Sequence, residues 1–410
     1  MLRKAIFPLG GLGTRLYPLT VETSKAVVRF LNRPLIEFVI VKLASQGVTE
    51  FYMGVSGYFN YKEVYDYFGE GLKIRLKYGF PDVRIRYQPN EDSVGNADSV
   101  RIIMEYYDIR EDVLVAQGDL LFDIDLKSFY SMHKSKEAFM TIAVKLIEED
   151  RDIRQFGVAD IDKDWRVRRF VEKPRSVEEA PSRYVNTGIY LLSKEFREFI
   201  SSPKAVEYRE RGMMDFGQHI IPLAIESGLP VYAYELTGYW FDIGTPERYL
   251  AAVFYMLRHL PPEELEAKTL IRGVKVQGKS RESQELHKEI LQSISKGEIK
   301  VDGENLIGRH VKIGKGISLA NSVIDNYTVV NNNVTINYSV VMDRCRIDSG
   351  TTIEHSIIGR HVKIGKNVRI ENSVIGDDTV IGDGATLRNV KVWPHREIPS
   401  GVYIENMIIR

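Results

Sequence analysis

A glycine-rich stretch near the start of the chain combines residue types that are suited to holding phosphate. Gly10, Gly11 and Gly13 carry no side-chain bulk, so backbone N–H groups can approach a phosphate closely. Arg15 adds a planar guanidinium that matches phosphate oxygens, and Lys25 adds a mobile positive charge. The spacing is that of neither a Walker loop nor the dinucleotide fingerprint. The glycines alone would equally fit an ordinary turn, and the two cations favour phosphate binding.

Two acidic residues in apolar surroundings are candidates for holding a divalent cation. Asp119 follows the apolar run 113–116, and Asp242 lies directly after the aromatic residues 239–241. A carboxylate in such surroundings needs a partner, and Mg²⁺ prefers oxygen ligands. The alternative is an aspartate that caps local N–H groups, although Thr245 is better placed to cap the helix that follows Asp242.

Glu172 and Lys173 form a third charged pair, directly before Pro174. Successive side chains of a strand point to opposite faces, so both residues reach one ligand only if the strand bends there. Pro174 ends the strand and favours such a bend. A surface salt bridge is the alternative. Gly95 opens a predicted helix at 94–107, where free N–H groups favour a phosphate or a flat ring. The alternative is an ordinary helix start without a ligand.

The elements that carry these residues alternate between short apolar runs and longer amphipathic segments. The predicted strands are 5–9, 51–55, 113–116, 139–144 and 188–192, and the predicted helices are 33–45, 94–107, 126–133 and 246–260. This alternation predicts an α/β fold with a mostly parallel sheet and helices on both faces. Ligands of such sheets bind outside the carboxyl ends of the strands, where Gly10 and Asp119 fall.

From residue 301 onward the sequence repeats with a period of 17 residues. Three columns keep this period: Ile307, Ile324, Val341, Ile358, Ile375 and Val392; Ile313, Val330, Ile347, Ile364 and Ile381; and Leu319, Ile336, Ile353, Ile370 and Leu387. Three inward apolar columns per coil predict a three-sided parallel β-helix. We therefore expect three parts: a first domain at 1–260, a linker with a helix at 282–295 within 261–300, and a β-helix at 301–410.

Composition excludes several classes of protein. The 410 residues include 56 Lys and Arg against 56 Asp and Glu, which argues against a nucleic-acid partner. Cys345 is the single cysteine, so an intramolecular disulfide is excluded. No apolar run approaches the roughly 18 to 20 residues of a membrane helix, and no signal-peptide pattern is present. We expect a soluble, cytoplasmic protein without a membrane partner.

The stretch 10–20 with Lys25 resembles the signature of the sugar-1-phosphate nucleotidyltransferases. The segments 117–119, 172–174 and 238–246 resemble further motifs of that family. This resemblance implies a Rossmann-like catalytic domain and a C-terminal left-handed β-helix of hexapeptide repeats. The tail 392–410 resembles the end of mannose-1-phosphate guanylyltransferases in particular. Asn96 replaces the threonine that is usual in the family's Gly-Thr-Ala segment.

The resemblance also implies a role for each site residue. The nucleotide-binding residues would be Leu9, Gly10, Gly11, Gly13, Thr14, Arg15, Gln88 and Gly95. The sugar-phosphate-binding residues would be Gly157, Glu172, Lys173, Asn186 and Thr187. Asp119 and Asp242 would hold one Mg²⁺. The catalytic residues would be Arg15, Lys25, Asp119, Lys173 and Asp242.

The implied reaction joins an NTP and a sugar 1-phosphate to give an NDP-sugar and pyrophosphate. GTP and mannose 1-phosphate are the first expectation, from the β-helix and the tail. The runs 215–217 and 95–98 favour adenylyl transfer to glucose 1-phosphate instead, and thymidylyl or uridylyl transfer stays open. A regulatory paralogue without turnover and an added acetyltransferase activity that uses His310, His355 or His361 also stay open. We expect the β-helix to form a homo-oligomer through its flat faces.

Overall fold

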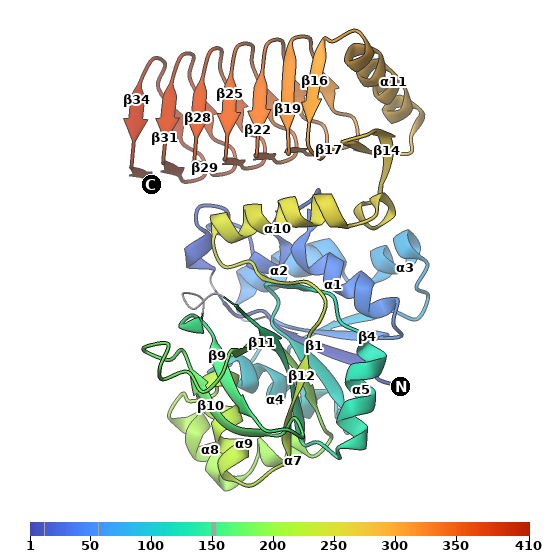
Figure 1. The fold of residues 1–410 in the computed structure, drawn as a ribbon, viewed down its shortest axis with the longest axis vertical. Coiled ribbons are helices and arrows are strands. Elements are labelled where there is room, and N and C mark those ends of the chain that lie inside the picture. Colours follow the sequence, from blue (N-terminus) through green and yellow to red (C-terminus); the bar gives the residue numbers. More distant parts are fainter. Residues whose placement is uncertain (12, 56, 149–152) are drawn as a thin grey trace. The chain divides into compact units, whose positions relative to one another are not determined.

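The computed structural model describes residues 1–11, 13–55, 57–148 and 153–410 (Figure 1). It divides into two compact units. The first consists of Met1–Gly11, Ser24–Val27 and Leu35–Asp242, and the second of Leu12–Thr23, Val28–Pro34 and Ile243–Arg410. Two short N-terminal segments therefore belong to the unit that contains the C-terminal residues. The predicted domain limits at residues 260 and 300 stay a prediction.

The first unit is built on a mixed sheet. Four strands in the order β6-β1-β4-β5 are parallel, while β11 pairs antiparallel with β6, β8 and β9. The apolar runs that predicted strands are almost wholly buried in it, which is expected of strands covered on both faces. The strands are β1 (Lys4–Pro8), β4 (Glu50–Gly54), β5 (Arg84–Tyr87), β6 (Val113–Ala116), β8 (Met140–Leu146), β9 (Gly157–Ile161), β10 (Val167–Glu172), β11 (Tyr184–Leu192) and β12 (Val231–Glu235).

Helices pack against this sheet, α4 on β1 and β4, α9 on β10, and α5 on β12. They are α1 (Leu35–Ala44), α2 (Tyr58–Phe68), α3 (Leu72–Tyr78), α4 (Asn96–Tyr106), α5 (Leu126–Ser135), α7 (Phe196–Phe199), α8 (Pro203–Glu210), α9 (Ile221–Glu226) and the π-helix Phe216–Ile220. The helix predicted at 33–45 begins only at Leu35, because Arg33–Pro34 pairs with Arg29–Phe30 as β3 with β2.

The second unit contains the parallel β-helix that the 17-residue period predicted. Each predicted column is a ladder between successive coils: Ile307 pairs with Ile324, Ile313 with Val330, and Leu319 with Ile336. The same pairing repeats along all three sheets, and their apolar side chains form one core. The fold class inferred from the sequence is confirmed, and the handedness of the β-helix stays a prediction.

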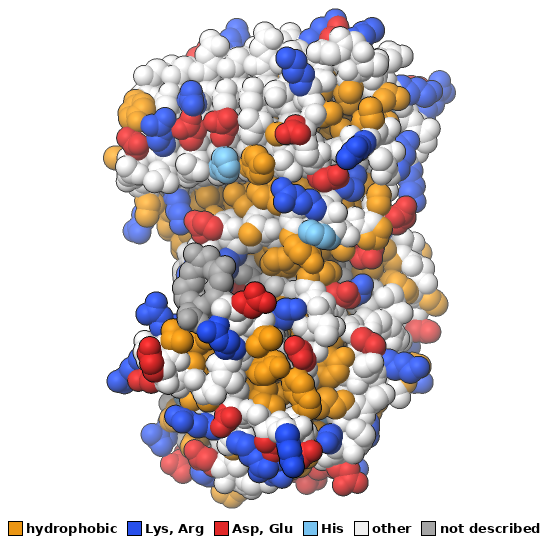
Figure 2. Space-filling model, viewed as in Figure 1, with side chains coloured by type: hydrophobic (Ala, Val, Ile, Leu, Met, Phe, Trp, Pro, Cys, Tyr) orange, Lys and Arg blue, Asp and Glu red, His pale blue; other side chains and the backbone are white. Residues whose placement is uncertain are grey.

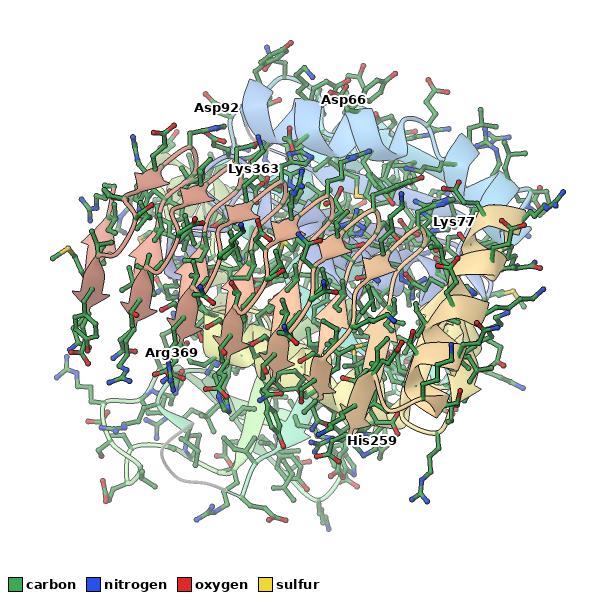
Figure 3. The ribbon with its side chains drawn as sticks, turned by 90° about the horizontal axis from the view of Figure 1, so that it is seen from above. Asp66, Lys77, Asp92, His259, Lys363 and Arg369 are labelled. Atoms are coloured by element: carbon green, nitrogen blue, oxygen red, sulfur yellow. The ribbon has the colours of Figure 1, made fainter. Side chains whose placement is uncertain are left out.

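The three sheets of the β-helix are seen from above in Figure 3, where Lys363 on β27 and Arg369 on β28 mark two of them. The first sheet holds β14 (Ala267–Ile271), β15 (Val274–Gln277), β17 (Asn305–Ile307), β20 (Val323–Ile324), β23 (Val340–Val341), β26 (Ile357–Ile358), β29 (Val374–Ile375), β32 (Lys391–Val392) and β35 (Ile408–Ile409). The second holds β16 (Ile299–Asp302), β19 (Ile317–Ala320), β22 (Thr335–Asn337), β25 (Thr352–Glu354), β28 (Arg369–Glu371), β31 (Thr386–Arg388) and β34 (Tyr403–Glu405). The third holds β18 (Lys312–Ile313), β21 (Val329–Val330), β24 (Arg346–Ile347), β27 (Lys363–Ile364), β30 (Val380–Ile381) and β33 (Glu397–Ile398).

Buried serines at the same position of four successive coils, Ser322, Ser339, Ser356 and Ser373, form a hydrogen-bonded ladder. The N–H of Ser356 donates to Oγ of Ser339 at 3.1 Å, and the N–H of Ser373 donates to Oγ of Ser356 at 3.0 Å. Each hydroxyl also donates to the carbonyl two residues earlier, as Ser356 does to Glu354 at 2.7 Å. The ladder therefore satisfies backbone groups at a corner where the strands are interrupted.

The β-helix begins before residue 301. β15 pairs parallel with β17, and β16 pairs parallel with β19, so both add to the sheets of the later coils. Between them α11 (Arg281–Ser295) packs on β14 and β16, and Ile290 joins the apolar core. The helix expected at 282–295 thus covers one end of the β-helix (Figure 1), as terminal repeats of such folds require.

The surface of the described residues mixes both signs of charge. Lys and Arg side chains are interspersed with Asp and Glu over the face drawn in Figure 2, which accords with the equal counts in the sequence. Among the described residues, no helix is both long and apolar enough to cross a membrane.

Candidate active site

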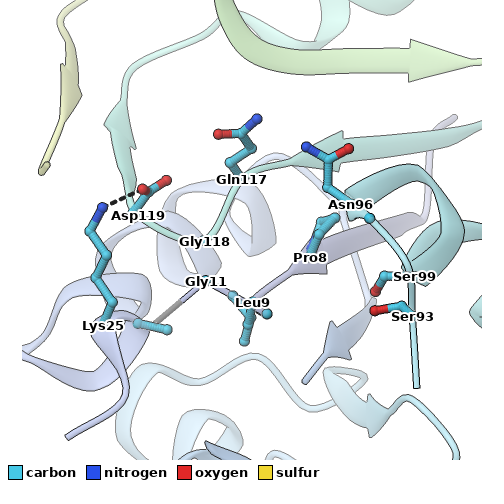
Figure 4. Close-up of a pocket in the computed structure, with 13 residues that line it drawn as sticks. Pro8, Leu9, Gly11, Lys25, Ser93, Asn96, Ser99, Gln117, Gly118 and Asp119 are labelled. Atoms are coloured by element: carbon cyan, nitrogen blue, oxygen red, sulfur yellow. Dashed lines mark hydrogen bonds and ion pairs between the residues drawn. The ribbon is translucent and has the colours of Figure 1, made fainter. Parts of the chain in front are cut away.

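A cavity of about 340 Å³ lies in the first unit, at the carboxyl ends of β1 and β6 (Figure 4). It brings together the first part of the glycine loop, the segment around the start of α4, and the turn after β6. These segments are distant in sequence, and each carries a predicted phosphate or metal site. The lining residues are Pro8, Leu9, Gly10, Gly11, Lys25, Ala26, Ser93, Gly95, Asn96, Ser99, Gln117, Gly118 and Asp119.

Two glycines allow the backbone segments around this cavity to approach one another. A Cβ atom at Gly118 would overlap the Leu9 side chain, and a Cβ atom at Gly95 would overlap the carbonyl of Met214. The N–H of Ala97 donates to that same carbonyl at 3.0 Å. Any other residue at these two positions would push the walls of the cavity apart.

Lys25 and Asp119 form an ion pair inside the cavity, drawn as a dashed line in Figure 4. Lys25 Nζ donates to Asp119 Oδ2, and the two side chains are 11% and 24% exposed. The lysine charge therefore balances Asp119 in the free protein.

Asp242 lies beside Asp119 in the register of a short antiparallel pair. β13 (Trp240–Asp242) pairs with β7 (Leu120–Phe122) so that Asp242 is opposite Leu120, the residue after Asp119. The described residues contain no group of three or more His, Cys, Asp and Glu side chains that could hold a metal. Two carboxylates fit Mg²⁺, which is commonly held by one or two protein carboxylates with water and substrate phosphates.

The bend predicted at Glu172 and Lys173 is present. β10 ends at Glu172, and Lys173 adopts a left-handed conformation with φ of 47°. The bend brings Lys173 Nζ to 3.8 Å from Glu172 Oε1. The lysine side chain is 60% exposed and the glutamate 19%, so one ligand can contact both.

Glu172 is held between two glycines. Cβ atoms at Gly157 or Gly217 would come too close to Glu172 Oε2. Burial, together with the charge of Asp215, raises the pKa of Glu172 to about 7, and Lys173 opposes this shift. With these opposing effects, the Glu172 carboxyl gains or loses its proton near neutral pH.

The remaining predicted sugar-phosphate residues lie on β11. Asn186 Nδ2 donates to the hydroxyl of Tyr190 at 2.9 Å. Thr187 is buried, and its hydroxyl donates to the carbonyl of Ala143 at 2.6 Å, while its own carbonyl accepts from Trp240 Nε1 at 3.0 Å. Thr187 therefore links β11 to β13, the strand that carries Asp242.

Gln88 does not line this cavity. Its amide is buried, accepts from Ser99 Oγ at 2.6 Å and donates to the carbonyl of Glu91 at 2.8 Å. It borders a second, larger cavity of about 1160 Å³ that is rich in tyrosines, including Tyr61 and Tyr65. The predicted role of Gln88 in binding nucleotide stays a prediction.

Gly13, Thr14 and Arg15 belong to the second unit. There the carbonyl of Gly13 accepts from Thr20 Oγ1 at 2.7 Å, and Gly13 has a left-handed φ of 63° that favours glycine. Their role in binding nucleotide stays a prediction.

Sequence reasoning gave no site role to Asn96 and Asp215, although the structure ties both to the predicted site. Asn96 lines the cavity, and Asp215 raises the pKa of Glu172. In the sequence, the run 215–217 bears only on the choice of substrate. The π-helix that it opens has no clear sequence pattern, which is why the contact with Glu172 was missed.

Comparisons with known proteins identify the family of most of the chain. The family described as "Nucleotidyl transferase" matches residues 4–258, and the "GMPPB C-terminal domain" matches residues 295–409. The UTP–glucose-1-phosphate uridylyltransferase of Synechocystis sp. is 31% identical over 253 residues, which are 61% of this chain. The match spans 62% of that relative's length.

Solved structures share the fold of part of the chain. A Bacillus anthracis protein described as a glucose-1-phosphate thymidylyltransferase, in complex with sucrose, gives a TM-score of 0.53 at 23% identity. The match covers 64% of this chain and 97% of the Bacillus anthracis chain. The UDP-glucose pyrophosphorylase from Acinetobacter baumanii gives a TM-score of 0.52 at 22% identity, and the match covers 65% of this chain and 97% of that chain. With the family match over residues 4–258, this chain belongs to the nucleotidyl transferase family.

Proposed function

We propose that the protein transfers a nucleotidyl group from an NTP to a sugar 1-phosphate and releases pyrophosphate. The observation that carries this proposal is the cavity in which the glycine loop, Lys25 and Asp119 meet, with Asp242 beside Asp119 in the strand register. It also has support from the Synechocystis relative, whose name gives UTP and glucose 1-phosphate as its substrates.

In the proposed reaction, an oxygen of the sugar 1-phosphate attacks the α-phosphorus of the NTP in line. The bond from the α-phosphorus to the oxygen that bridges to the β-phosphate breaks, and pyrophosphate leaves with both electrons of that bond. Such transfers depend mainly on positioning and on charge stabilisation. Lys25 and Arg15 neutralise the triphosphate, Lys173 holds the attacking phosphate, and Glu172 accepts hydrogen bonds from sugar hydroxyls.

Mg²⁺ is the proposed cofactor, held by Asp119 and Asp242. When bound, it would neutralise charge on the phosphates. The support is the donor set, two aspartates at the same end of the paired strands β7 and β13, where Asp242 is opposite Leu120. Asp119→Asn should abolish turnover while leaving the fold intact, and this can be checked by pyrophosphate release together with circular dichroism.

For the substrate pair, we propose GTP and mannose 1-phosphate first. The match of residues 295–409 to the GMPPB C-terminal domain supports this choice, together with the tail motif. Uridylyl transfer to glucose 1-phosphate is the second candidate, because the Synechocystis relative is named for it.

The test is a matrix of GTP, UTP, ATP and dTTP against mannose and glucose 1-phosphates, read by pyrophosphate release. Highest kcat/KM with GTP and mannose 1-phosphate supports the first choice, and UTP with glucose 1-phosphate supports the second. Absence of turnover with every pair would favour a non-catalytic paralogue. An acetyltransferase would need acetyl transfer from an acetyl-thioester, measured in parallel.

We also propose that the protein self-associates through the β-helix. Its three sheets present repeated outer faces, to which Lys363 on β27 and Arg369 on β28 contribute exposed side chains. Light scattering at micromolar concentration should give a mass above that of one 47.0 kDa chain, and a monomer would contradict the proposal.

A further inference from the structure

Asn96 connects the cavity of the glycine loop to a second part of the first unit. It lines that cavity at the start of α4. Its side-chain amide also bonds the segment that follows α8: Asn96 Nδ2 donates to Asp215 Oδ2 at 2.9 Å, and the N–H of Phe216 donates to Asn96 Oδ1 at 2.8 Å. The backbone reinforces this contact, since the N–H of Ala97 donates to the carbonyl of Met214.

The same segment forms one wall of the Glu172 site. Gly217 lies so close to Glu172 that a Cβ atom would overlap the carboxylate. Phe216 stacks on Tyr190, with ring centres 4.7 Å apart, and the Tyr190 hydroxyl accepts from Asn186. A shift of residues 215–217 would therefore displace Glu172 and Asn186 together.

The side-chain amide of Asn96 serves its two partners with two separate atoms, a donor NH₂ group and an acceptor oxygen. The N–H of Phe216 needs an acceptor, and the Asp215 carboxylate needs a donor. Threonine, which the family resemblance places here, has a single oxygen for the two contacts. Aspartate has the right shape but would set a second carboxylate against Asp215. Asp215 is committed as well, because its Oδ1 accepts from the N–H of Gln218 at 2.9 Å.

We propose that Asn96 and Asp215 are positioning residues, and that they couple the nucleotide cavity to the sugar-phosphate site at Glu172. A nucleotide that fixes Asn96 then holds residues 215–217 and Glu172 in the arrangement that the sugar 1-phosphate needs. The coupling is reciprocal, so each ligand tightens the binding of the other. This inference rests on the proposed function, in which Glu172 contacts the sugar.

The experiment measures the dissociation constant of the sugar 1-phosphate by calorimetry, with and without an α,β-methylene analogue of the NTP that the enzyme uses. The wild-type protein should bind the sugar phosphate at least about fivefold more tightly with the analogue present. In Asn96→Asp this ratio should fall towards one. Asn90→Asp is the matched control, because Asn90 is outside the proposed link.

A swapped pair separates coupling from simple damage to the fold. Asp215→Asn alone replaces one of the two accepting oxygens with an NH₂ group. That group then faces another donor, either Asn96 Nδ2 or the N–H of Gln218. The double variant Asn96→Asp with Asp215→Asn restores every hydrogen bond, and donor and acceptor are exchanged only in the bond between residues 96 and 215. It should therefore recover most of the coupling ratio that Asn96→Asp loses, and thermal unfolding checks that all variants fold.

The outcomes separate this inference from the proposed function. Turnover by the wild-type protein tests the function, independently of any variant. Once turnover is established, the inference is overturned if Asn96→Asp keeps the same ratio of dissociation constants, without and with the analogue, as the wild-type protein. A double variant that folds but stays uncoupled also overturns it, because the hydrogen bonds would then be present without their effect.

Discussion

Glu172 gives the proposed reaction a dependence on pH. The pKa of this carboxyl is raised to about 7, mainly by burial, so it is about half protonated at neutral pH. The ionised form accepts hydrogen bonds from sugar hydroxyls more strongly than the protonated form. We expect kcat/KM for the sugar 1-phosphate to rise as the pH increases through about 7, while kcat/KM for the NTP changes less.

The control for this prediction is Glu172→Gln, which keeps the shape of the side chain and removes its titration. The sugar phosphate has its own ionisation near pH 6. A rise in kcat/KM near pH 7 that disappears in Glu172→Gln therefore comes from the protein. A rise in kcat/KM that is unchanged in this variant comes from the substrate, and the prediction fails.

His133 on α5 makes stability depend on pH in a different range. It is fully buried, its Nδ1 lies 2.8 Å from Thr141 Oγ1, and burial lowers its pKa from 6.5 to about 4. Between these values the unfolded chain binds the proton and the folded protein does not, so stability falls as the pH decreases from 6.5 to 4. The largest loss is about 3 kcal/mol, measured as the free energy of unfolding in urea.

The matched variant is His133→Asn, whose amide can occupy the position of Nδ1 near Thr141 and does not titrate. This variant should be less stable than the wild type at pH 7 and should lose less stability on acidification. If both proteins lose the same free energy between pH 6.5 and 4, the loss comes from other groups.

At the scale of elements, the strands at 5–9, 51–55 and 113–116 and the helices at 94–107 and 246–260 were predictable because their apolar patterns are strong, whereas α2, α3, β5 and β12 were not predicted. The run 113–116 is β6 without change, and the 17-residue columns are the observed ladders of the β-helix. The end of β10 was predictable too, because Pro174 limits how a strand continues.

The other features depend on contacts between distant residues, which a period cannot reveal. The π-helix Phe216–Ile220 sits beside Glu172 through Gly217, although 44 residues separate Phe216 from Glu172 in the sequence. The pairing of Asn96 with Asp215 needs two hydrogen bonds that no local pattern specifies. The grouping of residues 13–23 with the β-helix likewise follows from tertiary packing.

Arg29 on β2 and Asp325 of the β-helix form a buried ion pair within the second unit. The guanidinium donates to both carboxylate oxygens, from Nε to Oδ2 and from Nη2 to Oδ1, the latter at 2.8 Å. Asp325 is 1% exposed, and burial raises its pKa even with Arg29 present. Arg29→Ala should lower the free energy of unfolding by about 3 to 5 kcal/mol, because it leaves a buried charge without its partner.

The pair can be tested as a double-mutant cycle in urea. The cycle compares Arg29→Met and Asp325→Asn with the double variant, which removes both charges and should cost less than Arg29→Met alone. The loss in Arg29→Ala should also shrink at low pH, where Asp325 takes up a proton. A cost that is the same at pH 4 and pH 7 would contradict the role of the charge.

At the scale of the whole molecule, the β-helix holds a segment that continues directly from the glycine loop. Within the second unit the Tyr17 ring meets the Trp393 ring edge to face, with centres 5.4 Å apart. His395 Nε2 lies 2.9 Å from Glu22 Oε2, and Arg360 Nη2 donates to Thr23 Oγ1 at 3.1 Å. Residues near the C-terminus thus fix residues 13–23, which include Arg15.

This arrangement predicts that Trp393 controls the order of residues 13–23. An aromatic pair contributes about 0.5 to 1.5 kcal/mol, so Trp393→Ala should speed hydrogen exchange at the amides of Leu16 and Leu19 by up to about tenfold. Trp393→Phe keeps a ring and should change exchange less. The amide of Ile357, bonded to Ser373 inside the β-helix at 3.0 Å, is the internal reference. Equal acceleration at Ile357 would mean that the β-helix itself has loosened, and unchanged exchange at Leu16 would show that the ring contact does not hold the segment.

With the proposed role of Arg15, Trp393→Ala should also raise KM for the NTP more than KM for the sugar phosphate.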